Sequence, residues 1–388
     1  YLPALARAST GAIQRLRCAR VMTDLPRGRI KQRPEDFVVD EIPAYPPTGA
    51  GEHVFVRFTK RDMTTMDAAK AIATALGCDP RATGAAGMKD KRAVATQTIS
   101  LQAPTGTDSA AVASRALSLA VEGLVVHEAT PHGHKIKPGH LVGNRFTITV
   151  RDVARDRIDD VVRGLERVAG DGVPNAFGKQ RFGAGGDNAA RALAWLLGKE
   201  RGPRDRRAQR FLWSSLQSAV FNEVLDARVG DGTWTTALEG DLLKRRQSGG
   251  LFVCTTVQTD AERAARGEVS PTGPMVGARM IWPQGAPGDL ERRIVAAALG
   301  DGFDLEATRR LGEGSRRALR MWVQDVRWEI VDDVPGHGAA SIRVYFVLPK
   351  GGYATTVLAA VVAVDETREP NASSSQPLDD TESETISQ

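Results

Sequence analysis

The segment of this sequence most suited to chemistry places one carboxylate among three cations. Lys89, Asp90, Lys91 and Arg92 follow one another directly after a Gly-Met pair. Nearby positive charge favours the ionised form of an acid, and an ionised, positioned aspartate can act as a nucleophile or a base. The alternative is a solvated loop whose screened ion pairs each contribute at most about 1 kcal/mol. These residues alone favour the solvated loop.

A second loop, which begins at Asn175, alternates aromatic, glycine and cationic residues. It could stack a base on Phe177 or Phe182 and read a base edge with Asn175. Lys179 and Arg181 could contact phosphate groups in the same loop. A structural turn with both phenylalanines in the core is an equally weighted alternative.

Histidines and lysines alternate in a third segment. His132 and His134 have a spacing that occurs in metal sites, but no Cys or acidic residue joins them in register. We therefore predict no metal site. Lys135 and Lys137 favour a basic loop that faces RNA, and a plain exposed loop is the alternative.

The elements that must position the Asp90 loop can be predicted from hydrophobic periodicity. Alternating apolar residues predict strands over residues 37–42 and 54–58. A helix should begin at Thr65 as its N-cap and end at Gly77. The loop should then lead into a strand over residues 94–101.

The rest of the chain alternates helices and strands around a polar joint at residues 199–210. Helical periodicity marks residues 158–168, 187–198, 211–228, 290–299 and 353–364, and strand character marks residues 251–257, 322–330 and 342–348. Residues 312–314 mark a return to strand-rich sequence. This order predicts an α+β domain that is interrupted by an inserted domain.

Charge is distributed unevenly along the chain. Its 388 residues carry a net charge of +5, with a pI of about 9.2. Residues 365–388 carry seven acidic side chains and one basic one, a net charge of −6, which leaves +11 on residues 1–364. The basic body indicates a polyanionic partner such as RNA.

Both ends of the chain are predicted to be disordered. Residues 1–23 hold four arginines and no acid; we favour a basic arm over a transit peptide. Residues 365–388 read as an acidic, Ser- and Thr-rich tail. The three cysteines form no readable disulfide or metal pattern, which indicates a reducing cytoplasm. No apolar run approaches the roughly 20 residues of a membrane span.

Several motifs, taken together in their order, resemble the TruD family of tRNA pseudouridine synthases. The first is a Lys-x-x-Pro-Glu-Asp-Phe signature that begins at Lys31, and the others lie at residues 51–53, 87–90, 140–146, 175–183, 314–319 and 348–355. The resemblance runs from about residue 29 to 360. It implies an α+β fold with a mixed, mainly antiparallel sheet in a catalytic domain (24–199 and 313–364), which is interrupted by a family-specific α/β insertion domain (200–312).

The resemblance also implies roles for individual residues. Asp90 falls on the family's nucleophilic aspartate, with Lys31 and Lys89 as helpers. Phe37, Asn175 and Tyr353 fall on positions that contact the target uridine. The loop compositions, independently of the resemblance, add Phe177 as a contact to the base. They also add the side chains expected to contact the RNA backbone, which are Arg92, Lys135, Lys137, Lys179 and Arg181. Ala176 stands where the family usually has Tyr, and the segment around Lys135 is less arginine-rich than usual.

The predicted activity is isomerisation of uridine to pseudouridine in tRNA, at uridine-13 of the D arm by family resemblance. We expect a cytoplasmic monomer with no cofactor. A non-catalytic RNA-binding or RNA-folding module would keep the basic surface without needing Asp90. A metal-dependent nuclease would need clustered carboxylates, and none are visible near the histidines.

Overall fold

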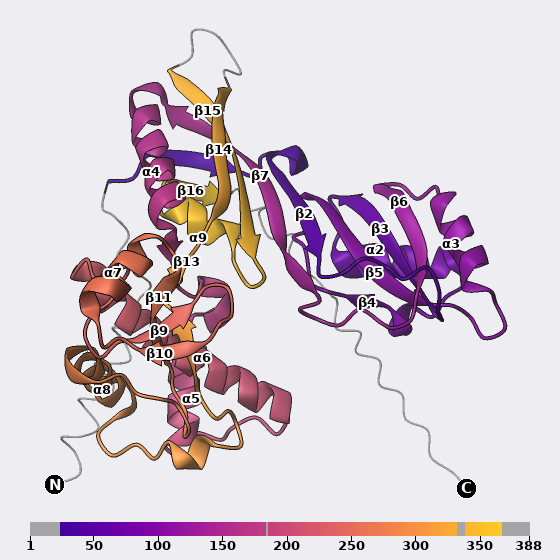
Figure 1. The fold of residues 1–388 in the computed structure, drawn as a ribbon. Helices are drawn as coiled ribbons and strands as arrows, with labels where there is room; N and C mark the ends of the chain where they lie inside the picture. Colours follow the sequence, from indigo (N-terminus) through magenta and orange to yellow (C-terminus); the bar gives the residue numbers. More distant parts are fainter. Residues whose placement is uncertain (1–23, 184, 332–337, 367–388) are drawn as a thin grey trace, which may run out of the picture.

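The computed structural model describes residues 24–183, 185–331 and 338–366, and its elements form two groups (Figure 1). The strands are β1 (Arg27–Ile30), β2 (Phe37–Pro43), β3 (His53–Arg61), β4 (Gly84–Ala85), β5 (Val94–Gln102), β6 (Leu124–His132), β7 (Leu141–Ala154), β8 (Val173–Pro174), β9 (Leu242–Arg245), β10 (Leu251–Val253), β11 (Val269–Met275), β12 (Ser315–Ala318), β13 (Arg320–Met321), β14 (Gln324–Val331), β15 (Ala339–Pro349) and β16 (Ala363–Glu366). The α-helices are α2 (Thr65–Leu76), α3 (Ser109–Leu117), α4 (Ile158–Asp171), α5 (Asn188–Leu196), α6 (Arg206–Gly230), α7 (Val257–Ala265), α8 (Gly285–Leu299) and α9 (Ala354–Ala359).

The first group is built on one large sheet. Its main path runs β14-β15-β7-β2-β5-β3-β6, while β1 pairs with β7 and β16, and β4 pairs with β5. Only β2–β5 and β1–β16 are parallel among the described pairs of this sheet. A mixed, mainly antiparallel sheet was predicted, and the α+β fold is confirmed. The central strand β7 links the two halves of the sheet (Figure 1).

Helices α2 and α3 cover the half of the sheet that carries β3, β5 and β6. Buried residues of α2 and α3 pack with those of β3 and β5 into one apolar cluster. The N-cap of α2 is Thr64, whose hydroxyl accepts a hydrogen bond from the Asp67 amide, so the predicted cap at Thr65 is wrong by one residue. Gly77 ends the helix with a left-handed φ of 72°, as its position predicted.

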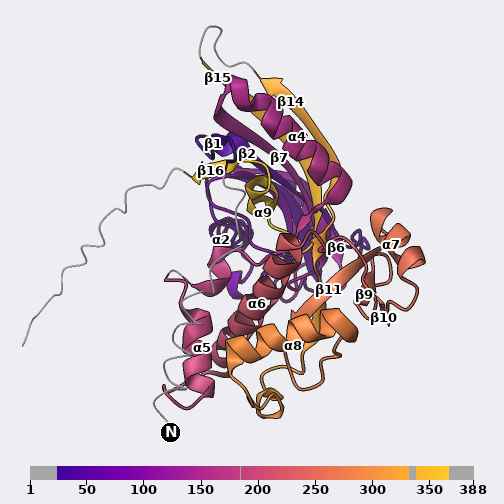
Figure 2. The same ribbon diagram turned by 90° about the vertical axis from the view of Figure 1, so that its left-hand side faces the viewer.

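The second group contains a smaller antiparallel sheet, β10-β9-β11-β12, with helices α5 to α8 beside it. Helices α5, α6 and α8 share an apolar cluster and lie together in Figure 2. Asp205 caps α6 by accepting from the Ala208 amide. The helix therefore begins inside the stretch predicted as a polar joint. The strand predicted over 251–257 ends at Val253, and Val257 begins α7.

The chain leaves and re-enters the large-sheet group at one place. There β8 pairs with β13, through Arg320↔Pro174 and Met321↔Val173. The Arg320 guanidinium donates to the carbonyl oxygens of Gly170 and Asp171 at the end of α4, and to that of Ala264 in α7. The carbonyls of Gly170 and Asp171 belong to the last turn of α4, where the helix itself supplies no donor. Arg320 therefore ties the end of α4 to α7 of the second group.

The C-terminal region differs from its predicted form. The helix predicted over 353–364 ends at Ala359, and residues 363–366 form β16, which pairs in parallel with β1. Asp365 and Glu366, which the sequence assigned to the tail, therefore belong to the sheet. The rest of the predicted tail, and the predicted arm at 1–23, lie outside the described residues.

Of the helices in the described ranges, none combines the length and the apolar character that a bilayer-crossing helix needs. Cys78 and Cys254 are buried free thiols, and burial raises the pKa of both, to about 11 at Cys254.

Candidate active site

Asp90 lies on the loop between β4 and β5, next to the turn that follows β1. Lys31 in that turn donates a hydrogen bond from Nζ to Asp90 Oδ2 at 2.8 Å. The side chain of Asp90 remains 51% exposed, so a reactant can reach its carboxylate. Lys31 has a left-handed φ of 58°, which costs an L-residue about 1 kcal/mol or more. Such strain is typical of functional positions.

The main chain of Asp90 is held by a lysine that the sequence did not single out. Lys60 on β3 is 0% exposed, and its Nζ donates to the Asp90 carbonyl oxygen at 2.5 Å. Burial lowers the pKa of Lys60 to about 8; Asp90 and Asp62 oppose this shift, and Lys89 adds to it. The burial of Lys60 could have been predicted from the sequence, because Lys60 continues the alternation of inward-facing residues along β3.

Lys89 anchors the loop on the opposite side. Its Nζ lies 2.5 Å from Glu41 Oε2, and both side chains are buried. The Glu41 carboxylate also accepts from the Thr98 amide, at 3.3 Å. The amide of Lys89 donates to the Thr65 hydroxyl, which in turn donates to Gln97 Oε1. Thr65 therefore holds the Asp90 loop instead of capping α2.

Phe37 and Arg92 complete the surroundings of Lys31. Phe37 is only 4% exposed and meets Phe146 edge-on, with ring centroids 6.1 Å apart. The Lys31 ammonium lies 4.5 Å from the centroid of the Phe37 ring, a cation–π contact. Arg92 donates to the carbonyl oxygen of Gln32 at 3.0 Å, so it fixes the turn that carries Lys31.

Asn175 belongs to a second cluster, in which its amide is bound on both sides. Its Nδ2 donates to the Ala318 carbonyl oxygen at 2.8 Å, and its Oδ1 accepts from Arg317 Nη2 at 2.5 Å. Arg317 also donates to the Asn175 carbonyl oxygen. Arg317 lies inside the motif at residues 314–319, but no role is predicted for it from the sequence. The structure makes it the residue that orients Asn175.

Aromatic rings and guanidinium groups alternate around Phe177 in this cluster. Arg317 lies over the Phe177 ring, with Cζ 4.1 Å from the centroid, and Arg181 lies at 5.7 Å. The Phe177 main chain bonds both amide atoms of Asn222 on α6. Phe221 meets Phe177 edge-on at 5.6 Å. The loop is therefore bound to α6 of the second group.

Tyr353 stands near Arg317 and is 55% exposed, at the start of α9. Burial lowers the pKa of Arg317 to about 10; the nearby Tyr353 opposes this shift and Arg181 adds to it. The Asp90 and Asn175 clusters rest on one shared core. That core contains Phe37 beside Lys31, Val173 before Asn175, and Ala354 after Tyr353.

The histidine segment forms an aromatic cluster at the far side of β4. Tyr45 stacks on His132, and its hydroxyl shares a hydrogen bond with His140 Nδ1 at 2.6 Å. Within the described ranges, no group of three or more His, Cys, Asp or Glu side chains is arranged to hold a metal ion. Lys137 is exposed and Lys135 is half-buried. Gly139 donates to the Ala86 carbonyl, so this segment packs on the start of the Asp90 loop.

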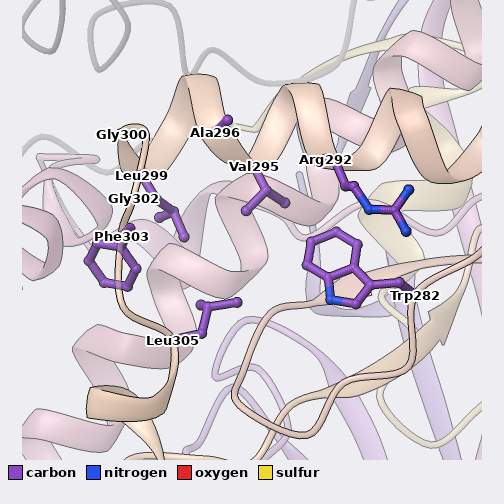
Figure 3. Close-up of a pocket in the computed structure, with 9 residues that line it drawn as sticks. All are labelled: Trp282, Arg292, Val295, Ala296, Leu299, Gly300, Gly302, Phe303 and Leu305. Carbon is purple, nitrogen blue, oxygen red and sulfur yellow. The ribbon is translucent and has the colours of Figure 1, made fainter.

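Two further features lie away from these clusters. Lys179 belongs to the 3₁₀ helix Lys179–Phe182, and its side chain lies outside the described part of the chain. On the second group, α8 and the following loop line a shallow hollow of about 160 Å³ (Figure 3). The Arg292 guanidinium lies 5.7 Å from the Trp282 ring at its rim. The hollow shares no lining residue with the Asp90 or Asn175 cluster.

Comparison with known proteins defines the class to which this fold and site belong. Residues 20–199 and 205–361 match the family described as tRNA pseudouridine synthase D (TruD). The tRNA pseudouridine synthase D of Anaeromyxobacter dehalogenans is 43% identical over 357 residues, which are 89% of this chain and 96% of that protein. The tRNA pseudouridine synthase D of Thermus thermophilus is 35% identical, over 88% of this chain and 91% of its own.

A solved structure shares the fold. The crystal structure of a putative TruD from Methanosarcina mazei superposes with a TM-score of 0.75 at 22% identity, covering 92% of this chain and 98% of that one. The chain belongs to the TruD family of tRNA pseudouridine synthases, and it is an isomerase of that class.

Proposed function

We propose that this protein converts uridine-13 in the D arm of tRNA into pseudouridine, with Asp90 as the nucleophile. One observation carries the assignment: a half-exposed carboxylate whose oxygen is held by Lys31 at 2.8 Å, on a loop fixed by Lys60 and Lys89. An anchored and accessible carboxylate is the group that such chemistry needs. A non-catalytic RNA-binding module would require none of this anchoring.

The reaction is an isomerisation in which atoms balance without a co-reactant. The bond from N1 of uracil to C1′ of the ribose breaks, the base turns, and C5 becomes bonded to C1′. C5 loses its proton and N1 gains one. The carboxylate of Asp90 attacks or assists at the sugar–base junction. The uridine must first leave its stack to reach this group.

The Asn175 cluster supplies contacts to the flipped base in this proposal. Asn175 Oδ1 already accepts from Arg317, but a carbonyl oxygen has two lone pairs, so one remains for the N3–H of uracil. Phe177 and the exposed Tyr353 offer ring faces for stacking. Phe37 is 4% exposed, too deeply buried for a large contact with the base, so its part in this proposal is to place Lys31.

We further propose that five basic side chains contact the RNA backbone: Arg92, Lys135, Lys137, Lys179 and Arg181. In this proposal residues 24–199 and 313–364 form the catalytic domain, and residues 200–312 form the insertion that clamps the RNA. The β8–β13 pairing supports a junction where the chain crosses between the two. The packing of α5 on α6 supports counting residues 188–196 with the insertion instead of with the catalytic domain. A cytoplasmic location and a monomeric state complete the proposal.

The position of modification is tested with matched tRNA substrates. Pseudouridine is mapped along a tRNA transcript after incubation with the protein, and along the same transcript with cytidine at position 13. We expect one site, at position 13, in the first transcript and none in the second. Modification at another position would overturn the uridine-13 assignment, and binding without any pseudouridine would favour the non-catalytic module.

A further inference from the structure

Lys60 occupies a position of β3 that is built for an apolar side chain. The preceding inward-facing residues of the strand are Val54, Val56 and Phe58, and each is 0% exposed, like Lys60 itself. An ammonium group at such a position costs several kcal/mol unless its contacts compensate. Methionine would fill a similar volume without that cost. The contacts of the Lys60 ammonium group should therefore explain why a charged residue occupies this position.

The group that Lys60 touches is the nucleophile loop. Its Nζ donates to the Asp90 carbonyl oxygen, while Lys31 holds the Asp90 carboxylate from the other side. The residue is therefore fixed at both its main chain and its side chain. Rotation or displacement of the carboxylate requires breaking one of these two bonds to an ammonium group.

The charges that act on Lys60 come from the neighbouring loops. Asp90 and Asp62 favour its protonated form, and Lys89 disfavours it. The residues paired with it on the flanking strands are Ala95 of β5 and Leu124 of β6, which carry no charge. Asp90 is therefore the group that Lys60 both bonds and balances electrically.

We propose that Lys60 is a positioning residue for pseudouridine formation, which fixes the main chain of Asp90 through a hydrogen bond from a buried, positively charged ammonium group. The proposal rests on the proposed role of Asp90. Because Lys60 has no exposed surface, it cannot contact the RNA. Its loss should therefore slow the chemical step and leave tRNA binding unchanged.

The test compares Lys60→Met and Lys60→Gln with the unaltered protein. Met keeps the volume and removes both bond and charge, whereas Gln keeps a donor and removes the charge. We expect the single-turnover rate of Lys60→Met to fall about 100-fold, the effect of misplacing a catalytic group by about an ångström. The dissociation constant for tRNA should not change. Lys70→Met, which removes an exposed lysine from α2, serves as the control and should keep the full rate.

A pH profile separates positioning by charge from a merely structural bond. The pKa of Lys60 is lowered to about 8, so its charge is present at neutral pH and is lost as the pH rises through that value. The unaltered protein should therefore lose rate above about pH 8 without losing tRNA affinity. Lys60→Gln should be slow at pH 7 and lack this alkaline loss. A melting curve shows whether Lys60→Met folds. If it does not, the pH profiles of the unaltered protein and of Lys60→Gln still test the proposed role of Lys60.

The proposal is overturned if Lys60→Met or Lys60→Gln turns over at the unaltered rate, or if tRNA affinity falls in parallel with the rate. A flat profile between pH 7 and 9 in the unaltered protein also overturns it. Asp90→Asn is measured beside them. If that variant is inactive while Lys60→Met is fully active, only the inference on Lys60 fails; if Asp90→Asn is active, the proposed function itself fails.

Discussion

Lysines around Asp90 hold oxygen atoms at short distances, whereas arginines around Asn175 both bind oxygen atoms and lie over aromatic rings. Lys31, Lys60 and Lys89 each place an ammonium within 2.8 Å of a carboxylate or carbonyl oxygen. Arg317 donates to Asn175 and also lies 4.1 Å from the centroid of the Phe177 ring. An ammonium is a compact point charge, while a planar guanidinium can stack and bond at once. The first cluster is thus suited to fix a reacting carboxylate, and the second to hold a flat ligand.

The difference between the two clusters predicts different effects for substitutions in each. Variants in the Asp90 cluster should change the rate of the chemical step or the stability of the loop. Variants in the Asn175 cluster should change the affinity for RNA. The shared apolar core beneath both clusters keeps their relative placement fixed.

The largest effect is expected for Asp90→Asn, which preserves shape but removes the negative charge. Single-turnover pseudouridine yield should fall by at least about 10⁴-fold, as for other residues that carry a reaction step. RNA affinity should stay equal or rise, because the substitution removes one anion from a loop that is proposed to face RNA phosphates. If Asp90 were only a solvated partner of Lys31, the loss would be about 1 kcal/mol or less, and most activity would remain.

A large effect on stability is expected for Glu41→Gln. It leaves the buried ammonium of Lys89 without its counter-ion, which typically costs about 3–5 kcal/mol. Urea unfolding measures the loss, and the turnover rate should fall with it because the loop is released. Glu262→Gln removes an exposed pair with Arg266 and should cost less than about 1 kcal/mol. Equal stability of the two variants would show that Lys89 does not need Glu41.

Arg317→Met should weaken tRNA binding more than it slows the chemistry. It removes the cation over Phe177 and the bond that orients Asn175, and a desolvated cation–π contact contributes about 2 kcal/mol. If all of this stabilisation serves to hold the conformation that binds RNA, affinity falls roughly 30-fold, and we expect a binding assay to show a loss up to that size. Arg263→Met removes a cation over Phe252 at 5.1 Å, in another cluster, and should leave affinity unchanged. The reverse pattern would contradict the division between the clusters.

The smallest effect is expected for Lys137→Gln, on the exposed basic segment. If Lys137 contacts one phosphate, the slope of log affinity against log salt should become shallower by about one. The rate at saturating tRNA should not change, because the side chain lies on the histidine segment and not in either cluster. An unaltered slope would remove Lys137 from the RNA interface.

Much of the large-sheet group could be predicted because its strands alternate strictly. The alternation of Val54, Val56 and Phe58 predicts β3, and Gly77 predicts the end of α2. The cap was misplaced because Thr64 and Thr65 are the same residue type. Only the fold shows that the Thr65 hydroxyl is occupied by Lys89 and Gln97.

Other features could not be predicted because they depend on distant pairing. β16 has four residues, and its apolar character continues that of α9, so its pairing with β1 was invisible. Val257 has high strand propensity but begins α7. Asp90 was recognisable as a candidate, whereas the hydrogen bond from Lys60 to Asp90 and the stacking of Arg317 depend on strands and loops far away in the chain.

The split of the large sheet along the chain has a consequence for its synthesis. β7 ends at Ala154, and the strands that cover its outer side, β14 and β15, begin at Gln324. At about 5–20 residues per second, the intervening residues take roughly ten to thirty seconds to be made. During that interval the growing chain carries a fourteen-residue strand with one unpaired edge. Most of the second group, with its own sheet and apolar clusters, is synthesised before β14 and β15. These two strands can therefore complete the large sheet only after most of the second group has been made.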